Sequence, residues 1–158
     1  MERITFKDAP GVFAVLAKVQ EYLDNCGLDH SLIELLVFRV SQINSCAYCL
    51  DMHFKDATYL GMDPIKLVSV AAWRDAPYYS SKEQSVLAFA EYLTHLPAEE
   101  DSSNIHDELE KHFTKEEIAN LTLAVIQINS WNRLTRSFGP VVGVYKANSR
   151  KAAMAELQ

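Results

Sequence analysis

Residues 41–53 read SQINSCAYCLDMH, and the interpretation of the whole chain starts from this stretch. Asn44 and Ser45 are residues that favour helix N-caps, so a helix is expected to begin there. Cys46 and Cys49 then lie three residues apart in the first turn of that helix, where both sulfur atoms reach one face. This spacing brings them close enough for a disulfide bond.

The position of the two cysteines favours thiol chemistry. Unpaired backbone N–H groups at a helix N-terminus carry partial positive charge, which stabilises a thiolate. A C-x-x-C pair at such a position lowers the thiol pKa by about a unit or more from its usual value of about 8.5. His53 follows Cys49 by four residues and Cys46 by seven, so the three side chains share one stripe of the helix. An imidazole on that stripe is able to take or return a proton.

Two other interpretations of the same residues stay open at this point. C-x-x-C pairs also bind structural zinc, but such sites need four ligands, and Cys46, Cys49 and His53 supply only three. The fourth ligand would be a carboxylate or the distant Cys26. An inert cysteine pair beside a hydrogen-bonded structural histidine is the second alternative. The conjunction of two cysteines and a histidine on one helix face favours redox chemistry over both.

The composition fits one helical domain that covers residues 1–158. Hydrophobic residues make up 49% of the 158-residue chain and charged residues 23%, which allows a real hydrophobic core. Five glycines and five prolines are too few for a loop-rich β architecture. No repeat or long linker divides the chain, so we expect a single-domain, all-α helical bundle.

Apolar residues recur with the helical period almost throughout, which predicts about seven helices. Their expected ranges are about 12–23, 29–44, 45–61, 63–73, 81–96, 104–113 and 114–138. The second is apolar on most sides and is expected to be a buried central helix. Ser81 with Gln84, and Thr114 with Glu117, resemble capping boxes. In the tail 141–158, residues 141–145 are expected to be extended, and residues 150–158 to form a weak helix or a frayed end.

The distribution of charged and apolar residues argues against several classes of function. The formal net charge is −6 with lysine and arginine scattered among acids, so the basic footprint of a nucleic-acid-binding protein is missing. No apolar stretch approaches the ~18 residues that indicate a membrane helix. The first residues lack the apolar core of a signal peptide, which predicts a cytosolic protein. In that reducing compartment, a C-x-x-C pair indicates redox or metal chemistry.

Several notable residues lie outside the cysteine stretch. Glu34 lies among apolar residues, and periodicity alone favours a carboxylate that faces solvent or pairs with Arg39 or Lys66. Cys26 is expected to be a buried, small apolar residue. A polar cluster in the last long helix suits either a pocket lining or an oligomer interface; its members are Gln127, Asn129, Trp131, Asn132 and Arg133.

The spacing of Glu34, Cys46, Cys49 and His53 resembles the alkyl hydroperoxidase D-like (AhpD-like) branch of the carboxymuconolactone decarboxylase family. The glutamate lies twelve residues ahead of the first cysteine. The surrounding segments are similar too, namely LIEL at 32–35, the stretch 41–53, and INSWNRL at 128–134. The resemblance covers residues 28–61 as a redox core, extends more weakly to residue 138, and is strongest to the peroxidase-related subgroup.

The resemblance implies an all-helical subunit that assembles into trimers or hexamers and reduces organic hydroperoxides or hydrogen peroxide with thiols. The many apolar helix faces also favour a homo-oligomer. Cys49 would carry the sulfenic acid, Cys46 would donate a proton and resolve the intermediate to a disulfide, and Glu34 with His53 would form a proton relay. The implied dithiol reductant is a lipoyl protein or a thioredoxin-like protein. The chemistry requires no cofactor and no metal.

Two details qualify this interpretation. Tyr48 stands where the best-studied peroxidase of the family has a histidine, and a phenol is no base near neutral pH, so a shorter relay and a lower turnover are expected. Cys46 feels more of the helix dipole whereas Cys49 is nearer His53, and the resemblance decides for Cys49 as the attacking sulfur. Decarboxylation is disfavoured because that branch is not built on a cysteine pair. The alternative function is a redox-sensing or thiol-exchange protein with little peroxidase turnover.

Overall fold

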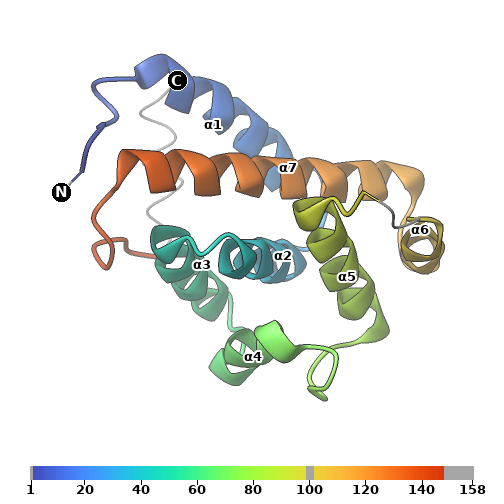
Figure 1. The fold of residues 1–158 in the computed structure, drawn as a ribbon. Coiled ribbons are helices and arrows are strands. Elements are labelled where there is room, and N and C mark those ends of the chain that lie inside the picture. The colour runs from blue at the N-terminus through green and yellow to red at the C-terminus, as the bar shows by residue number, and fades with distance from the viewer. Residues whose placement is uncertain (1, 99–101, 148–158) are drawn as a thin grey trace.

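The structure, a computed structural model, describes residues 2–98 and 102–147. Within these ranges the chain forms seven α-helices, one 3₁₀ helix and no β-strand (Figure 1). The elements are α1 (Pro10–Asp24), α2 (His30–Ile43), α3 (Ala47–Tyr59), α4 (Pro64–Ser69), η1 (Val70–Ala72), α5 (Ser81–His95), α6 (Ser103–Glu110) and α7 (Lys115–Phe138). The predicted all-α single domain is confirmed. None of the described helices combines the length and the apolarity that crossing a bilayer requires.

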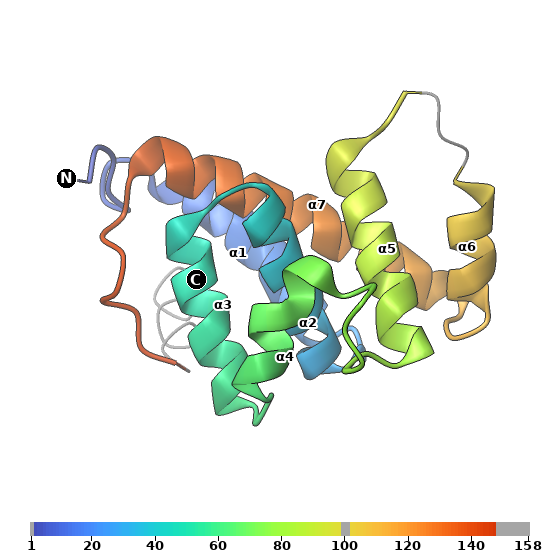
Figure 2. The same cartoon turned by 60° about the horizontal axis from the view of Figure 1, so that its bottom comes forward.

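The helix α2 is the centre of the bundle, as its apolar sequence predicted. It packs against α3, α5 and α7, and it runs between α3 and α5 in both views of the fold (Figures 1 and 2). Leu36 and Val40 on one side of α2 pack into a cluster with residues of α5 and α7. Leu35 and Phe38 on another side pack into a second cluster with residues of α3, α4 and η1. Because a buried leucine contributes about 1.5–3 kcal/mol, burial on both sides fixes the position of α2.

Local side chains set the ends of the long helices. The Asp29 carboxylate accepts a hydrogen bond from the Leu32 N–H at 2.9 Å and so caps α2. Thr114 and Glu117 form the predicted capping box at the start of α7. Gly139 ends α7 with a left-handed φ of 72°, a conformation that glycine adopts without steric strain.

Other predicted helix ends are displaced. The capping box of α5 is formed by Ser80 and Glu83, one residue before the predicted Ser81 and Gln84. The Glu83 carboxylate accepts from the Ser80 N–H at 2.9 Å, whereas Gln84 uses its side-chain amide to donate to the Tyr79 carbonyl. The helix α6 ends at Glu110 rather than at residue 113. Ser80 and Ser81 are each followed, three residues later, by a side chain that can accept a hydrogen bond, so both match the capping-box pattern equally well. Only the observed hydrogen bonds show which serine is the cap.

Residues 139–147 run back along α3 without forming a strand. Lys55 Nζ on α3 donates hydrogen bonds to the carbonyl oxygens of Gly143 and Tyr145 at 3.2 and 3.0 Å. The expectation of an extended segment at 141–145 is wrong in this respect, because the segment contains turns and is held by a side chain rather than by a neighbouring strand. The predicted helix or frayed end at 150–158 lies outside the described residues.

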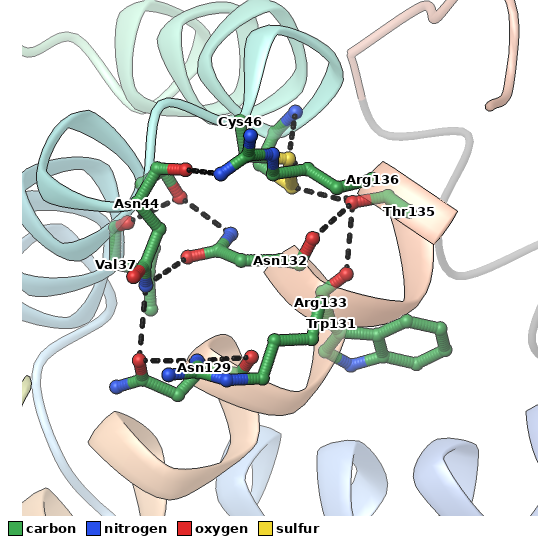
Figure 3. The surroundings of a disulfide bond; sticks show 11 residues. Val37, Asn44, Cys46, Asn129, Trp131, Asn132, Arg133, Thr135 and Arg136 are labelled. Atoms are coloured by element: carbon green, nitrogen blue, oxygen red, sulfur yellow. Dashed lines mark hydrogen bonds between the residues drawn. A yellow bond between two sulfur atoms is a disulfide. The ribbon is translucent and has the colours of Figure 1, made fainter. Parts of the chain in front are cut away.

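A network of amide side chains joins the end of α2 to α7 (Figure 3). Asn44 Nδ2 donates to Oδ1 of both Asn129 and Asn132 at 2.9 Å. Asn132 is 1% exposed, and its Nδ2 donates to Ser41 Oγ at 3.1 Å. Arg136 Nη1 donates to the Asn44 carbonyl at 2.9 Å. Part of the polar cluster predicted in the last helix therefore holds the turn that precedes the cysteine pair.

We expect Asn132→Ala to lower the free energy of unfolding by about 2–3 kcal/mol, because it leaves polar groups of Asn44 and Ser41 without their buried partner. Denaturant unfolding followed by circular dichroism measures the loss. Ser137→Ala, an exposed change on the same helix, is the control and should stay within about 0.5 kcal/mol of wild type. Equal stabilities of Asn132→Ala and the control would contradict a structural role for the network.

Candidate redox site

Cys46 occupies the N-cap of α3. Its sulfur accepts a hydrogen bond from the Cys49 N–H at 3.4 Å. The predicted cap at Asn44 or Ser45 is wrong by one or two residues, because Ser45 takes a left-handed φ of 52° that turns the chain between α2 and α3. The helix begins at Ala47, so the predicted location of both cysteines at a helix N-terminus is confirmed.

Cys46 and Cys49 form a disulfide bond, with their Cα atoms 5.3 Å apart. Each cysteine is only 1% exposed. Cys26 is a free, half-buried cysteine at the end of α1, and its thiol donates to the Leu23 carbonyl at 3.1 Å. The C-x-x-C pair is therefore separate from the third cysteine, as its spacing predicted.

Thr135 of α7 contacts both sulfur atoms (Figure 3). Its hydroxyl oxygen lies 3.0 Å from Cys46 Sγ and 3.3 Å from Cys49 Sγ. The same hydroxyl reaches the carbonyl oxygens of Trp131 at 2.8 Å and Asn132 at 3.2 Å. Sequence reasoning missed this residue, because no motif links a threonine to a cysteine 86 positions earlier.

His53 and Glu34 form a buried hydrogen-bonded pair between α3 and α2. His53 Nδ1 lies 2.8 Å from Glu34 Oε2, and each residue is 3% exposed. A carboxylate at such a depth is stable only with a partner, and the imidazole supplies one. When Nδ1–H donates to the carboxylate, Nε2 of the neutral ring carries the lone pair. This Nε2 atom is buried and has no hydrogen-bond partner among the described residues.

The partners that periodicity assigned to Glu34 are engaged elsewhere. Arg39 pairs with Glu91 at 2.7 Å, and Lys66 pairs with Glu83 at 2.5 Å. The interpretation of Glu34 as a solvent-facing or surface-paired carboxylate is therefore wrong. The pairing with His53 agrees with what the family resemblance implied.

Asp56 lies beside this pair. Ligand-type atoms of Glu34, His53 and Asp56 lie within 4.8 Å of one another, and all three residues are buried. Tyr145 donates its hydroxyl to the Asp56 carboxylate, with both oxygens at 2.9 Å. A cation at this position would have to displace the hydrogen bonds from His53 and Tyr145. The group includes neither cysteine, so it differs from the zinc site considered from the sequence.

A cavity of about 550 Å³ opens next to the disulfide. Cys49, His53, Glu34 and Thr135 contribute to its wall, and Cys46 does not. Most of the remaining wall is apolar or aromatic and includes Phe6, Phe13, Val37, Ile128, Trp131 and Phe138. These four side chains thus lie in the wall of a largely apolar chamber, of the size that small organic ligands occupy.

Tyr48 also lines the cavity. Burial raises the pKa of its phenol above the usual value, and the negative charges of Asp51 and Glu2 add to the effect. The phenol therefore stays protonated at neutral pH and serves as a hydrogen-bond donor rather than a base. This agrees with the expectation from the sequence that Tyr48 does not act as a base.

The polar cluster of α7 has two separate roles. Gln127 and Trp131 line the cavity, and Gln127 Nε2 also donates to the Leu16 carbonyl at 2.7 Å. Asn129 and Asn132 belong to the amide network, and Arg133 donates to the Asn129 carbonyl and side chain at 2.9 and 2.8 Å. Of the two roles left open by the sequence, Gln127 and Trp131 have that of a pocket lining.

Comparison with known proteins relates the chain to a described family. The model of the carboxymuconolactone decarboxylase family matches residues 10–92, a range that contains the cysteine pair, His53 and Glu34. The uncharacterised protein YdfG of Bacillus subtilis (strain 168) is 30% identical over 139 residues, which are 87% of this chain and 95% of YdfG.

Two solved structures extend the comparison. A protein of unknown function from Agrobacterium tumefaciens, described as a candidate antioxidant defence protein AhpD, is 32% identical with a TM-score of 0.86, covering 92% of this chain and all (100%) of that one. The debrominase Bmp8 is 18% identical with a TM-score of 0.77, covering 97% of this chain and 80% of its own. The second likeness shows a shared fold.

We expect peroxide-treated protein to contain one intrachain disulfide, between Cys46 and Cys49, with Cys26 left as a thiol. The reason is that Cys46 and Cys49 are already at bonding geometry, whereas Cys26 follows α1 and its thiol donates to the Leu23 carbonyl. Non-reducing peptide mapping by mass spectrometry identifies the link. A dominant link through Cys26 would contradict the assignment.

Proposed function

The chain belongs to the carboxymuconolactone decarboxylase family, and from this premise we propose that it is a thiol-dependent peroxidase that reduces organic hydroperoxides. One observation carries the proposal: Cys49 and the buried His53–Glu34 pair line the same apolar cavity. A nucleophile, a base with an orienting carboxylate, and a chamber for an organic group are the parts that the reaction needs.

The first step uses Cys49. Its thiolate attacks the terminal oxygen of the hydroperoxide, the O–O bond breaks, and Cys49 becomes a sulfenic acid. The departing alkoxide takes a proton and leaves as an alcohol. His53 supplies that proton from Nε2, having taken it from the Cys49 thiol, while Glu34 holds the ring through Nδ1. That Cys49 and not Cys46 lines the cavity supports this order of the two sulfurs.

The second step closes the disulfide. The Cys46 thiol releases its proton and attacks the Cys49 sulfur as a thiolate, the S–O bond breaks, and the departing hydroxide takes up that proton and leaves as water. A dithiol reductant then supplies two electrons and two protons and restores both thiols. Both cysteine residues are 1% exposed, which favours a slender dithiol arm, as in a lipoyl protein, although a thioredoxin-like reductant is the other class that we propose. Assembly into a homo-oligomer and a cytosolic location stay predictions.

Steady-state consumption of cumene hydroperoxide with dihydrolipoamide or a thioredoxin system tests the function. We expect Cys49→Ser to reduce consumption to the uncatalysed background, since the nucleophile is lost. Cys46→Ser should stop after one turnover and accumulate a sulfenic acid that a dimedone probe captures. Cys26→Ser is the matched control and should keep wild-type turnover. Background rates in the wild type, together with rapid exchange of its disulfide with dithiols, would instead favour the redox-sensing or thiol-exchange alternative.

A further prediction concerns the proton relay. His53→Ala should slow peroxide consumption by roughly 10²-fold or more, the usual scale for a general acid–base group. Glu34→Gln should do less damage, because it removes the orienting charge and leaves the imidazole in place. Stopped-flow rates of thiol oxidation measure both, and circular dichroism checks that the helices survive. A folded His53→Ala protein with the wild-type rate would return His53 to a structural role.

A further inference from the structure

The side chain of Thr135 is the one hydroxyl that the described residues place against both sulfurs of the redox pair. It comes from α7, on the opposite side of the disulfide from α3, and lies 3.0 Å from Cys46 Sγ and 3.3 Å from Cys49 Sγ (Figure 3). It also lines the cavity together with Cys49. The hydroxyl therefore lies beside both of the sulfur atoms that react in the proposed cycle.

A hydroxyl group has a single proton to donate, so its acceptor depends on the redox state. In the disulfide form the sulfurs are weak acceptors, and the Trp131 carbonyl at 2.8 Å is the strongest competitor for the proton. When one thiol of the dithiol form ionises, its sulfur carries a full negative charge. A hydrogen bond to an ionised acceptor is roughly twice as strong as one between neutral groups, so the proton then turns to the thiolate.

We propose that Thr135 is a further catalytic residue, whose hydroxyl donates a hydrogen bond to whichever of the two sulfurs is ionised. It supports the Cys49 thiolate before peroxide attack and the Cys46 thiolate before disulfide closure. Rotation of one hydroxyl serves both, because both sulfurs lie within reach of the same oxygen. The inference deepens the proposed peroxidase function and rests on it for its catalytic meaning.

The local backbone supports a shared donor. The helix N-terminus already supplies one N–H, from Cys49, to the Cys46 sulfur. His53 follows Cys49 on the same helix, but its Nδ1 is held by Glu34, and the proton that its Nε2 takes from the Cys49 thiol is passed on to the departing alkoxide. Thr135 thus adds a donor from a second helix, and this donor does not have to give its proton away.

The test measures thiol ionisation directly. The rate of iodoacetamide alkylation is followed against pH for Cys49 in a Cys46→Ser background and for Cys46 in a Cys49→Ser background, with each site read by peptide mass spectrometry. Thr135→Val removes the hydroxyl and keeps the shape. We expect it to raise the thiol pKa by about one unit in both backgrounds, a tenfold change equivalent to about 1.36 kcal/mol. Thr135→Ser keeps the donor and should titrate within a few tenths of a unit of wild type.

Thr122→Val is the matched control. Thr122 is another half-buried threonine of α7, and its hydroxyl donates to the carbonyl four residues earlier, at 2.8 Å, as that of Thr135 does. It should leave both titrations unchanged. An equilibrium with glutathione gives an independent reading: loss of a thiolate donor makes the disulfide of Thr135→Val harder to reduce. The difference should grow as the pH rises through the thiol pKa, up to about tenfold, or about 30 mV.

Each other outcome overturns the proposal. If Thr135→Val titrates as wild type in both backgrounds, the Thr135 hydroxyl donates to neither thiolate. If it shifts the titration in just one background, the hydroxyl is not shared between the two sulfurs. A Thr135→Ser protein that behaves as Thr135→Val assigns the effect to the methyl group. Because these titrations need no peroxide, they separate failure of this inference from failure of the peroxidase function, which the turnover assay alone decides.

Discussion

The hydrogen bond between His53 and Glu34 is the constraint on which the arrangement of the site depends. Glu34 lies on the most buried helix of the bundle, where an unpartnered carboxylate would cost several kcal/mol of stability. Its partner has to come from a neighbouring helix, and α3 supplies it. This bond fixes the rotation of α3 about its axis. Since Cys49 is one turn before His53 on that helix, the same rotation places Cys49 in the cavity wall.

A second helix completes the cysteine environment from the other side. The amide network from Asn44 to Asn132 ties the turn before Cys46 to α7, and Thr135 stands one turn further along α7, against the sulfurs. The two restraints act on different atoms. The amide network holds the backbone turn that leads into α3, and the Thr135 hydroxyl contacts the cysteine sulfurs. In the reaction cycle that we propose, the disulfide opens and closes repeatedly and benefits from both restraints, since neither depends on the S–S bond itself.

The parts of the site that sequence predicted are the local ones. Cys46, Cys49 and His53 share a stripe because helix geometry alone relates residues three and four apart. The pairing of Glu34 with His53 was predicted only through the family resemblance, because the two residues lie 19 positions apart on different helices. Thr135 is 86 residues from Cys49, and its contact exists only after α7 packs against α3. The fold class could be predicted from periodicity because helix periodicity is also a local property. The helix caps could not, because two adjacent polar residues fit the cap position equally well in sequence and only one of them forms the bond.

The family membership and the cavity wall carry different information about chemistry. The family model covers residues 10–92, and this range holds Cys49, His53 and Glu34, for which we propose the roles of nucleophile, base and orienting carboxylate. Much of the aromatic wall lies outside it, because Phe6 precedes this range and Trp131 and Phe138 belong to α7. The debrominase Bmp8 shares the fold at 18% identity, so the fold by itself does not select the molecule that meets the thiolate. For the peroxidase activity that we propose, selection therefore has to arise from the wall, where apolar side chains favour a substrate that brings apolar surface to Cys49 and disfavour small, strongly hydrated molecules.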